Sequence, residues 1–507
     1  MRKTCLLVAA LLVPALLFGQ SFTASVRGTV TDASGGMVPG AKVVLKDLDR
    51  NVQYKGETDT MGRYLITALP IGTYVLTVDS AGFQTFQRSP FRLEVQQQAT
   101  IDVQLQVGAL AASVQVEAGA PLLNTTSANL GQVIENQYID RLPLIARNTY
   151  QLVYLAPGVV GSAGSQVAAG AANFSAAGTR NSTAEIMLDG VTVTAPEQNG
   201  GITAVYHNPS VDAVQEFKVQ TAFFSAEFGN AGGAVINMVT KTGTNQYRGS
   251  AYWFRRDSAI SANSFFSNRA GLRKPSSHRN LYGATFGGPI SRDRAFFFAA
   301  YERIPQKFPY AQAATFPTPQ QREGNFTDYV TTAGRAIAVY NPFDTYTDPA
   351  GAVKRRLFPG NIVPKSMFDP IAVRAASYYP LPTRPGIVNN WYAEGVTTST
   401  EWQLETKLDY NLSEKNRLSG RYSPRRSLSV RPNLFGEGKP GLPWEIKHMR
   451  GSADNGMLDF TRTHSPWTVI SVRLGAVRPE GYHRPLVPFD LTSLGLPKYM
   501  KDVADYQ

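Results

Sequence analysis

The sequence contains almost no cysteine and few histidines, and it has no long apolar run after its first 20 residues. Its single cysteine, Cys5, lies near the N-terminus, so the rest of the chain can form neither a disulfide bond nor a cysteine metal site. The five histidines are scattered without the spacing of a metal site: His207, His278, His448, His464 and His483. No later stretch approaches the ~18 uncharged apolar residues of a membrane-spanning helix, so any membrane crossing must use β-strands. We therefore expect no metal site and no bound cofactor.

The first 20 residues have the pattern of a signal peptide. Arg2 and Lys3 give a basic start, and residues 6–18 form a mostly apolar run. That run is too short to cross a bilayer core of about 30 Å as a helix, and it fits the apolar region of a secretory signal. Residues 1–20 are predicted to be a signal peptide removed near Gln20, and the protein to be exported. A buried N-terminal helix is the alternative.

Composition and charge favour several β-rich domains. The chain has 507 residues, of which 43% are hydrophobic, with 44 glycines and 32 prolines, which suits β-structure with many turns. Residues 1–244 carry 15 Lys and Arg against 17 Asp and Glu, whereas residues 245–507 carry 35 against 21. A basic half can indicate nucleic-acid binding. Here the arginines are spread singly among Tyr, Pro and Gly without a basic helix, so no nucleic-acid partner is expected.

Residues 22–107 read as a small β-sandwich, because short alternating runs are separated there by turn residues. The segment closely resembles the carboxypeptidase regulatory-like domain at these motifs: Gly28-Thr29-Val30-Thr31-Asp32, Val38-Pro39-Gly40-Ala41, Gly62-Arg63-Tyr64, Leu69-Pro70-Ile71-Gly72-Thr73-Tyr74 and Gly82-Phe83. The resemblance implies an accessory fold without peptidase chemistry, which could bind a carbohydrate or a protein. No zinc-binding HxxE or HExxH arrangement accompanies it.

Two glycine-rich motifs mark residues 110–243. Residues 178–181, Gly-Thr-Arg-Asn, precede the strand-like Ile186-Met187-Leu188, which ends in an Asp189-Gly190 turn. Residues 228–241 run from Phe-Gly-Asn-Ala-Gly-Gly into the strand-like Val235-Ile236-Asn237, ending at Thr240-Lys241. Upstream, residues 129–143 carry Ile134, Tyr138, Ile139 and Leu142 at helical spacing and are predicted to form a short helix.

The glycines Gly229, Gly232 and Gly233 could suggest a phosphate-binding loop. Such a loop requires a strand, the glycine turn and then a helix, with a Lys-Ser/Thr or a ribose-binding acid downstream. Here the glycines lead into a β-branched strand instead. We interpret them as tight turns within a packed domain.

From residue 245 the sequence predicts an antiparallel transmembrane sheet. Residues 402–412 alternate Trp, Leu, Thr, Leu, Tyr and Leu with Gln, Glu, Lys, Asp and Asn, as expected for a strand with one face to lipid and one to a wet lumen. A short turn leads to residues 417–422, which alternate likewise. Five further strands are predicted at residues 247–256, 281–288, 295–302, 457–464 and 467–477. Residues 303–398, rich in Pro, Tyr and Arg, are predicted to be a long extracellular loop region.

Together these motifs resemble TonB-dependent outer-membrane receptors, and most closely the Oar-like group. The implied fold is mainly β: a small β-sandwich at 22–107, an α+β plug domain at 110–243 and part of an antiparallel transmembrane β-barrel at 245–507. The implied plug motif comprises Arg180, Asp189, Gly190, Gly229, Gly232, Gly233, Asn237 and Lys241. The alternating run Val114, Gln115, Val116, Glu117 and Ala118 is either a strand that pairs with the energy transducer TonB or the exit strand of the sandwich.

The resemblance implies import of an extracellular solute, such as an oligosaccharide or a metal chelate, by a protein of the Gram-negative outer membrane in contact with its lipid. TonB would be the partner that displaces the plug. A surface adhesion or protein-export component is the alternative. No nucleophile–base pair or paired carboxylates can be isolated, so we expect no enzyme activity.

The number of strands bears on how much of a barrel the sequence encodes. Plugged transporters use about 22 strands, whereas about seven can be recognised between residues 245 and 507. We therefore expect this chain to be part of a longer protein and to be inactive in transport by itself.

The signal peptide yields the first prediction. N-terminal sequencing of the mature protein from an outer-membrane fraction should begin close to Gln20, because the apolar run ends at Phe18. A cytosolic product that retains Met1 would contradict it.

Overall fold

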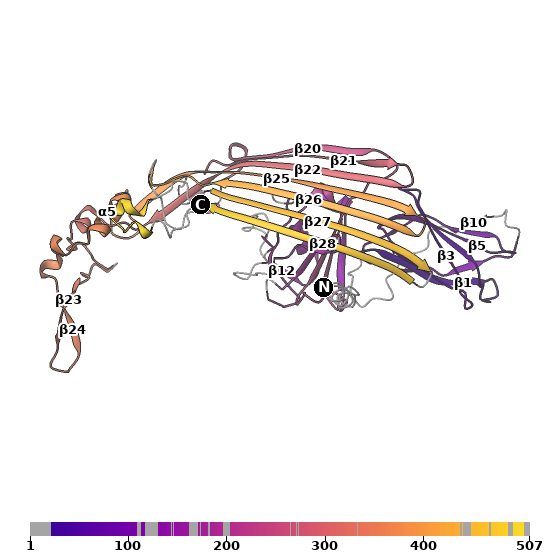
Figure 1. The fold of residues 1–507 in the computed structure, drawn as a ribbon, viewed down its shortest axis with the longest axis horizontal. Coiled ribbons are helices and arrows are strands. Elements are labelled where there is room, and N and C mark those ends of the chain that lie inside the picture. The colour runs from indigo at the N-terminus through magenta and orange to yellow at the C-terminus, as the bar shows by residue number, and fades with distance from the viewer. Residues whose placement is uncertain are drawn as a thin grey trace, which may run out of the picture.

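The computed structural model describes residues 22–108, 113–116, 130–142, 144, 147–161, 171–172, 174–180, 183–195, 203–263, 265–269, 271, 273–331, 333–436, 439, 448–465, 468–484 and 490–500. The fold is mainly β, as predicted. It comprises a sandwich, a middle domain and a curved seven-stranded sheet, which we call the wall (Figure 1). No helix within the described ranges is both long enough and apolar enough to cross a membrane.

The sandwich consists of two sheets that enclose one core. One sheet has the order β4-β1-β8, with β9 also on β1, and the other has the order β10-β6-β5-β2-β3, with β7 on β5. The strands are β1 (Ala24–Asp32), β2 (Lys42–Asp47), β3 (Gln53–Glu57), β4 (Arg63–Leu69), β5 (Gly72–Asp79), β6 (Thr85–Arg88), β7 (Phe91–Leu93), β8 (Gln98–Thr100), β9 (Val103–Leu105) and β10 (Ser113–Val116).

The alternation seen in the sequence creates the core of the sandwich. Val26 and Leu45 point inward and are fully buried, while their strand neighbours are more exposed; Leu76 of β5 is also fully buried. The buried Tyr64 donates its hydroxyl hydrogen to the Ile101 carbonyl at 2.7 Å, so its polar end is satisfied. Gly28 allows β1 to approach that same carbonyl, because a Cβ there would lie 1.8 Å from the oxygen.

The middle domain is built on a five-stranded sheet of order β11-β18-β19-β15-β16. Its strands are β11 (Leu130–Glu135), β15 (Glu185–Leu188), β16 (Val191–Thr192), β18 (Val214–Ala222) and β19 (Val235–Thr240). The 3-10 helices η3 (Thr149–Leu155) and η5 (Val211–Ala213) contribute buried side chains to its core. Short strand pairs join β12 (Val159–Gly161) to β14 (Phe174–Ala176) and β13 (Ala171–Ala172) to β17 (Thr203–Ala204).

The helix predicted over residues 129–143 is largely wrong. Residues Leu130–Glu135 form strand β11, and only Asn136–Arg141 form a helix, α2. β11 pairs antiparallel with β18 from Gly131↔Gln220 to Glu135↔Glu216. The apolar residues have helical spacing, but pairing with β18 gives the backbone of residues 130–135 hydrogen bonds within the sheet. The contact with β18 therefore decides the local structure.

The wall is an antiparallel meander in which each strand pairs with the next, and all seven predicted strands are present. The strands are β20 (Arg248–Asp257), β21 (His278–Ser291), β22 (Ala295–Ala314), β25 (Trp391–Ser413), β26 (Asn416–Val430), β27 (His448–Ser465) and β28 (Thr468–Arg484). Short turns join β21 to β22, β25 to β26 and β27 to β28 at one end of the wall, where the sandwich also lies (Figure 1). Short turns are typical of the periplasmic end of such sheets.

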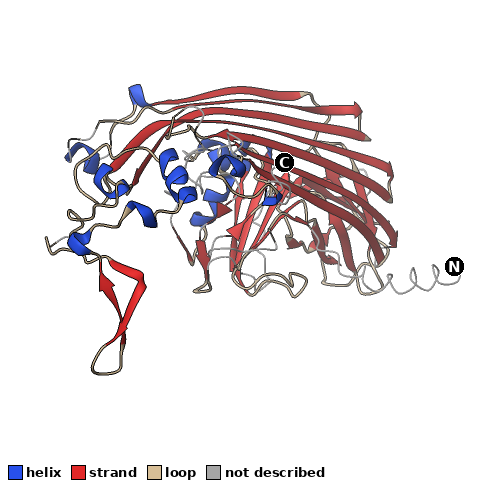
Figure 2. Ribbon diagram, turned by 60° about the vertical axis from the view of Figure 1, so that its left-hand side comes forward, coloured by secondary structure: helices blue, strands red, loops and turns tan. Residues whose placement is uncertain are grey.

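The long connection at the other end is shorter than predicted, because both flanking strands extend further. β22 continues to Ala314 and β25 begins at Trp391, and the two pair along this whole length. The connection contains α4 (Pro319–Arg322), α5 (Pro370–Tyr378) and a projecting hairpin of β23 (Tyr340–Thr347) and β24 (Val353–Leu357) (Figure 2). An aromatic cluster of Phe316, Tyr379, Trp391 and Phe435 packs where the connection joins the wall.

The sandwich core yields the second prediction. Residues 22–108 expressed alone should fold cooperatively without metal or disulfide, and Leu76→Ala should destabilise this fragment by roughly 2–5 kcal/mol, because it leaves a cavity. Leu48→Ala, at a site that is 46% exposed, is the matched control and should change stability by less than about 0.5 kcal/mol. Thermal and urea unfolding followed by circular dichroism measure both. A non-cooperative melt of the unsubstituted fragment would contradict an independent core.

Candidate functional site

The wall has the reverse of the usual protein surface: its outward face is apolar and its inward face is polar. On β25 the side chains of Gln403, Glu405 and Lys407 are buried against the middle domain. On the opposite face Leu408 is 56% exposed, and Leu458 and Leu474 on β27 and β28 are 48% and 60% exposed. This arrangement is stable only where the outward face meets an apolar medium.

The centre of the contact between wall and middle domain is one carboxylate, that of Asp189, which is completely buried. Lys407 Nζ lies 3.1 Å from Asp189 Oδ1, and Arg421 Nε lies 2.9 Å from Oδ2. Thr240 of β19 donates to both oxygens, from its backbone N–H at 3.1 Å and its hydroxyl at 2.7 Å. A middle-domain anion is thus held between two cations of the wall.

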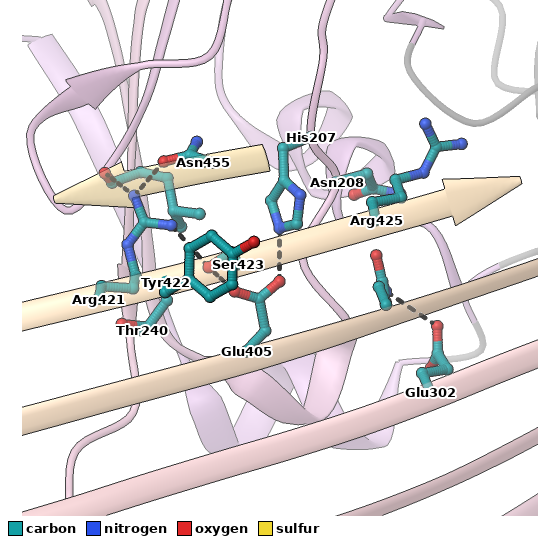
Figure 3. A network of polar contacts seen from close by, with 12 residues as sticks. His207, Asn208, Thr240, Glu302, Glu405, Arg421, Tyr422, Ser423, Arg425 and Asn455 are labelled. Carbon is teal, nitrogen blue, oxygen red and sulfur yellow. Dashed lines mark hydrogen bonds and ion pairs between the residues drawn. The ribbon is translucent and has the colours of Figure 1, made fainter. Parts of the chain in front are cut away.

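The guanidinium of Arg421 also fixes its surroundings (Figure 3). It donates to Ser423 Oγ and Asn455 Oδ1, both at 2.8 Å, and to the Leu188 carbonyl at 3.2 Å. These partners come from β26, β27 and β15, so one side chain joins two wall strands to the middle domain. A planar guanidinium suits this role because its donors point in fixed directions.

The electrostatics keep Asp189 ionised. Burial alone raises the pKa of Asp189, but attraction by Lys407 and Arg421 and the hydrogen bonds from Thr240 outweigh burial and hold the pKa below 3.8. A carboxylate whose pKa is lower in the folded than in the unfolded state stabilises the fold at neutral pH. This stabilisation is lost as the pH falls through the pKa of the folded state. The arrangement is an ionic tie between two domains rather than a proton-transfer site.

A second buried contact lies one row further along β25. His207 of the middle domain is completely buried, and its Nε2 lies 2.5 Å from Glu405 Oε1. Glu405 also accepts a hydrogen bond from the Ser423 hydroxyl (Figure 3). Tyr150 donates its hydroxyl hydrogen to the His207 carbonyl. Nothing in the spacing of the histidines along the sequence indicated this contact of His207.

The Asp189-Gly190 turn presents the carboxylate to the wall. Both residues have left-handed backbone angles, with φ of 48° and 74°, and they connect β15 to β16 as predicted. Glycine is favoured at position 190 because its φ of 74° lies in the left-handed region, and a Cβ there would also displace the end of the Arg473 side chain of β28, 2.4 Å away. The next residue, Val191, packs over Gly475 of β28, where a Cβ would also collide.

The other predicted motif residues lie apart from this contact. Arg180 is exposed, Lys241 uses its backbone N–H to bond the Ala213 carbonyl, and Asn237 is buried in the centre of β19. Of the three glycines, only Gly233 is tightly surrounded, since a Cβ would lie 2.1 Å from Thr179 Oγ1. Nothing lies near a Cβ at Gly229, and at Gly232 the nearest atom is 3.3 Å away. None of the three has a positive φ, so their interpretation as tight turns stays a prediction.

The predicted transducer-contact run is partly placed. Val114, Gln115 and Val116 lie in β10, which pairs in parallel with β6 of the sandwich. Glu117 and Ala118 lie outside the described residues. The pairing matches the alternative of a sandwich exit strand, and contact with a transducer remains a prediction.

A cavity of about 880 Å³ opens above the middle domain, at the end of the wall away from the sandwich. Its floor is formed by Arg147, Asn148, Asn208 and Pro209 of the middle domain. Its side is formed by successive inward positions of the wall, which on β25 are Ser399, Glu401 and Gln403. Below Gln403 the inward residues of β25 contact the middle domain instead, so Gln403 marks the boundary between cavity and packed interface.

The cavity lining is polar and mainly cationic. Seven lysines and arginines line it against two glutamates, Glu302 and Glu401; the cations are Arg147, Arg256, Lys274, Arg279, Lys307, Arg425 and Arg450. Arg425 is neutralised by a two-point ion pair with Glu401 at 2.6 and 2.9 Å. Arg256 and Arg279 stand directly opposite each other on β20 and β21. Like charges in this register repel, and an anion between them would relieve the repulsion.

Within the described residues no group of three or more His, Cys, Asp or Glu side chains is placed to hold a metal ion. The polar clusters described above join domains or line the cavity.

The wall has an apolar outer face, and its polar inner face holds a folded domain. These features are typical of outer-membrane β-barrel proteins that enclose a domain. The chain belongs to the outer membrane beta barrel domain family, whose model matches residues 239–503, more than half of its length. The carboxypeptidase regulatory-like domain model matches residues 25–106, which confirms the predicted resemblance of the sandwich. The protein is therefore located in the Gram-negative outer membrane.

The chain is also similar to one curated protein and to parts of several solved structures. The TonB-dependent transporter Oar of Myxococcus xanthus is 29% identical over 319 residues, which cover 59% of this chain and 28% of Oar. Among solved structures, the ferric enterobactin receptor PfeA of Pseudomonas aeruginosa is 10% identical, with 69% of this chain and 46% of PfeA covered and a TM-score of 0.33. The outer membrane transporter YddB of Escherichia coli is 13% identical, with 66% and 45% covered and a TM-score of 0.35. The chain thus spans less than half the length of each of these proteins.

The ionic cluster yields the third prediction. Asp189→Asn should destabilise the protein by roughly 3–5 kcal/mol, because it leaves Lys407 and Arg421 buried without their anion. The control is Asp454→Asn, which removes the ion pair with Arg426 between two wall strands, where both side chains are about one-third exposed. That control should cost at most about 1 kcal/mol. Urea unfolding in detergent measures both variants.

Adding Lys407→Met to Asp189→Asn should recover part of the loss, since one unpaired buried cation is then removed. Equal, small effects of Asp189→Asn and Asp454→Asn would contradict a central role for the cluster.

Proposed function

We propose that the chain is part of a TonB-dependent transporter that imports an extracellular solute, and that its middle domain is the plug. The observation that supports this is the buried polar contact between Asp189 and the wall, with an open cavity above it. Polar contacts can be exchanged for water when the plug moves, whereas an apolar interface of the same area would resist wetting. A polar interface therefore suits a plug that must be displaced and returned.

The cavity is the proposed solute site, and its charge favours an anionic solute such as a metal chelate over a neutral oligosaccharide. Arg256 and Arg279 are the residues that we expect to bind a carboxylate, catecholate or phosphate group, because guanidinium groups form paired hydrogen bonds with such anions. Phe308 is the only aromatic residue that lines the described part of the cavity, which offers little surface for stacking on sugar rings.

The energy transducer is the proposed partner, and β10 is its proposed contact. β10 is the last strand of its sheet among the described residues, so a partner strand can add to its other edge. Alternatively, unpairing from β6 would free Val114, Gln115 and Val116 for the partner.

Surface adhesion is the second candidate function, and the projecting hairpin is the observation in its favour. β23 and β24 extend away from the wall, and Phe343 and Val353 are 84% and 73% exposed (Figure 2). Exposed apolar side chains on such a projection can contact another surface.

The test is uptake by cells that carry the protein, which is the fourth prediction. Anionic metal chelates should accumulate, an uncoupler of the proton-motive force should abolish accumulation, and the double change Arg256→Gln/Arg279→Gln should lower it by about tenfold or more, as expected for loss of charged hydrogen bonds. Lys354→Gln on the projecting hairpin is the matched control, because it removes a cation outside the cavity.

The cells must carry the longer protein of which this chain is part, since the chain alone is expected to be inactive in transport. Accumulation that resists the uncoupler would contradict TonB-dependent transport. Uptake of neutral oligosaccharides that the double variant leaves unchanged would contradict the anionic site while leaving transport intact. Cell attachment that is lost on deletion of residues 340–357, without any uptake phenotype, would favour adhesion.

A further inference from the structure

The contact between the sandwich and the middle domain contains a buried carboxylate, that of Glu216 on β18. This side chain is completely buried, and its two oxygens bond to the sandwich. Arg92 Nη2 lies 2.7 Å from Oε1, and the backbone N–H of Val95 donates to Oε2 at 2.8 Å. Arg92 also lies 3.8 Å from Glu135 on β11, so both of its ion pairs are with the middle domain.

Val95 receives a second bond from the same strand. Lys218, two residues after Glu216, donates from Nζ to the Val95 carbonyl at 3.0 Å. The N–H and the C=O of one peptide segment in the sandwich are therefore both bonded by side chains of β18. Two hydrogen bonds to the same residue fix both the position and the orientation of this sandwich segment relative to β18.

Apolar packing completes the joint. Phe22, Val95 and Val239 form a small buried cluster, with Ile71 against it. Val239 lies on β19 immediately before Thr240, the residue that donates to Asp189. The sandwich thus covers the strand that supports the ionic cluster.

The sandwich also contacts the wall at its short-turn end. Lys55 Nζ lies 2.7 Å from Glu414 Oε1 in the turn between β25 and β26. Asn245 donates from its side chain to the Arg50 carbonyl at 2.8 Å, and its N–H donates to the Asp49 carbonyl at 2.9 Å. The Arg473 guanidinium of β28 lies 4.4 Å from the centre of the Phe22 ring.

We propose that the sandwich holds the plug closed, with Arg92 and Val95 as the residues that bind Glu216 and Lys218. The sandwich is fixed to the plug on one side and to the wall on the other. The plug strands β18 and β19 therefore cannot leave the wall unless one of these two sets of contacts opens. The surface that the sandwich presents, residues 92–95 with Phe22 and Ile71, is an intramolecular docking surface for the plug.

This role rests on the proposal that the middle domain moves during transport. It predicts that undocking of the sandwich precedes opening of the plug. The experiment therefore follows docking and plug opening directly, without any uptake measurement.

Docking is measured by zero-length carbodiimide cross-linking in outer-membrane vesicles that carry the protein. The contact of 2.7 Å between Lys55 and Glu414 should give an isopeptide bond detectable by mass spectrometry. Glu414→Gln should abolish that cross-link and serves as its control. Plug opening is measured in the same vesicles as hydrogen exchange of the β19 amides, Val235–Thr240.

Arg92→Gln is the test variant, because Arg92 is 34% exposed and forms ion pairs only with the middle domain in the described structure. It should lower the yield of the Lys55–Glu414 cross-link and speed exchange of the β19 amides by about tenfold or more, since truncating one partner of a buried charged pair is strongly destabilising. Arg63→Gln is the matched control, because Arg63 forms its ion pair with Asp59, which also belongs to the sandwich. It should change neither measurement.

Val95→Asp is the stronger variant, because it places a carboxylate beside Glu216 while sparing the main sandwich core, of which Val95 is not a member. Loss of the cross-link with unchanged β19 exchange in either variant would overturn the proposal, since the plug would then stay closed without the sandwich. Retention of the cross-link together with unchanged β19 exchange in both variants would also overturn it, because neither docking nor plug opening would then depend on the Glu216 contacts.

Discussion

The buried carboxylate of Asp189 is the constraint on which the arrangement of the domains depends. A charge that is removed from water must be paired and hydrogen-bonded, and Asp189 obtains both cations from the wall and both hydroxyl and N–H donors from Thr240. Its partners lie 218 and 232 residues away in the chain. The middle domain therefore has one position in which this charge is satisfied, and that position is inside the wall.

The inward polar face of the wall is used differently along its length. Near the sandwich, Lys407 and Arg421 hold the middle domain, and the next row, Glu405, binds His207. Beyond Gln403 the same face is free of protein and lines a cationic cavity. One alternating pattern thus produces an interface and then a proposed binding site along the same strands. The position of the middle domain along the wall determines where the interface ends and the cavity begins. In our proposal, the contacts with the sandwich hold the middle domain at that position.

The sequence predicted the local elements well and the long-range contacts poorly. All seven wall strands and the Asp189-Gly190 turn follow from alternation and turn residues, which are properties of neighbours in the chain. The extension of β22 past Pro309 was missed because proline is usually excluded from sheets; beyond Lys307, however, β22 pairs only with β25 and is an edge strand. The polar face of residues 403–409 was assigned to a wet lumen, since nothing local shows that Asp189 and His207 are its partners.

The most direct test of this account is the distance between the middle domain and the wall with and without the central carboxylate. The only cysteine of the sequence is Cys5, which lies within the predicted signal peptide. Spin labels can therefore be attached to cysteines introduced in place of the exposed Tyr138 of α2 and Leu458 of β27. Double electron–electron resonance should give one narrow distance distribution for the unsubstituted chain and a broadened or shifted one for Asp189→Asn. The same narrow distribution in both would contradict the claim that Asp189 holds the middle domain in place.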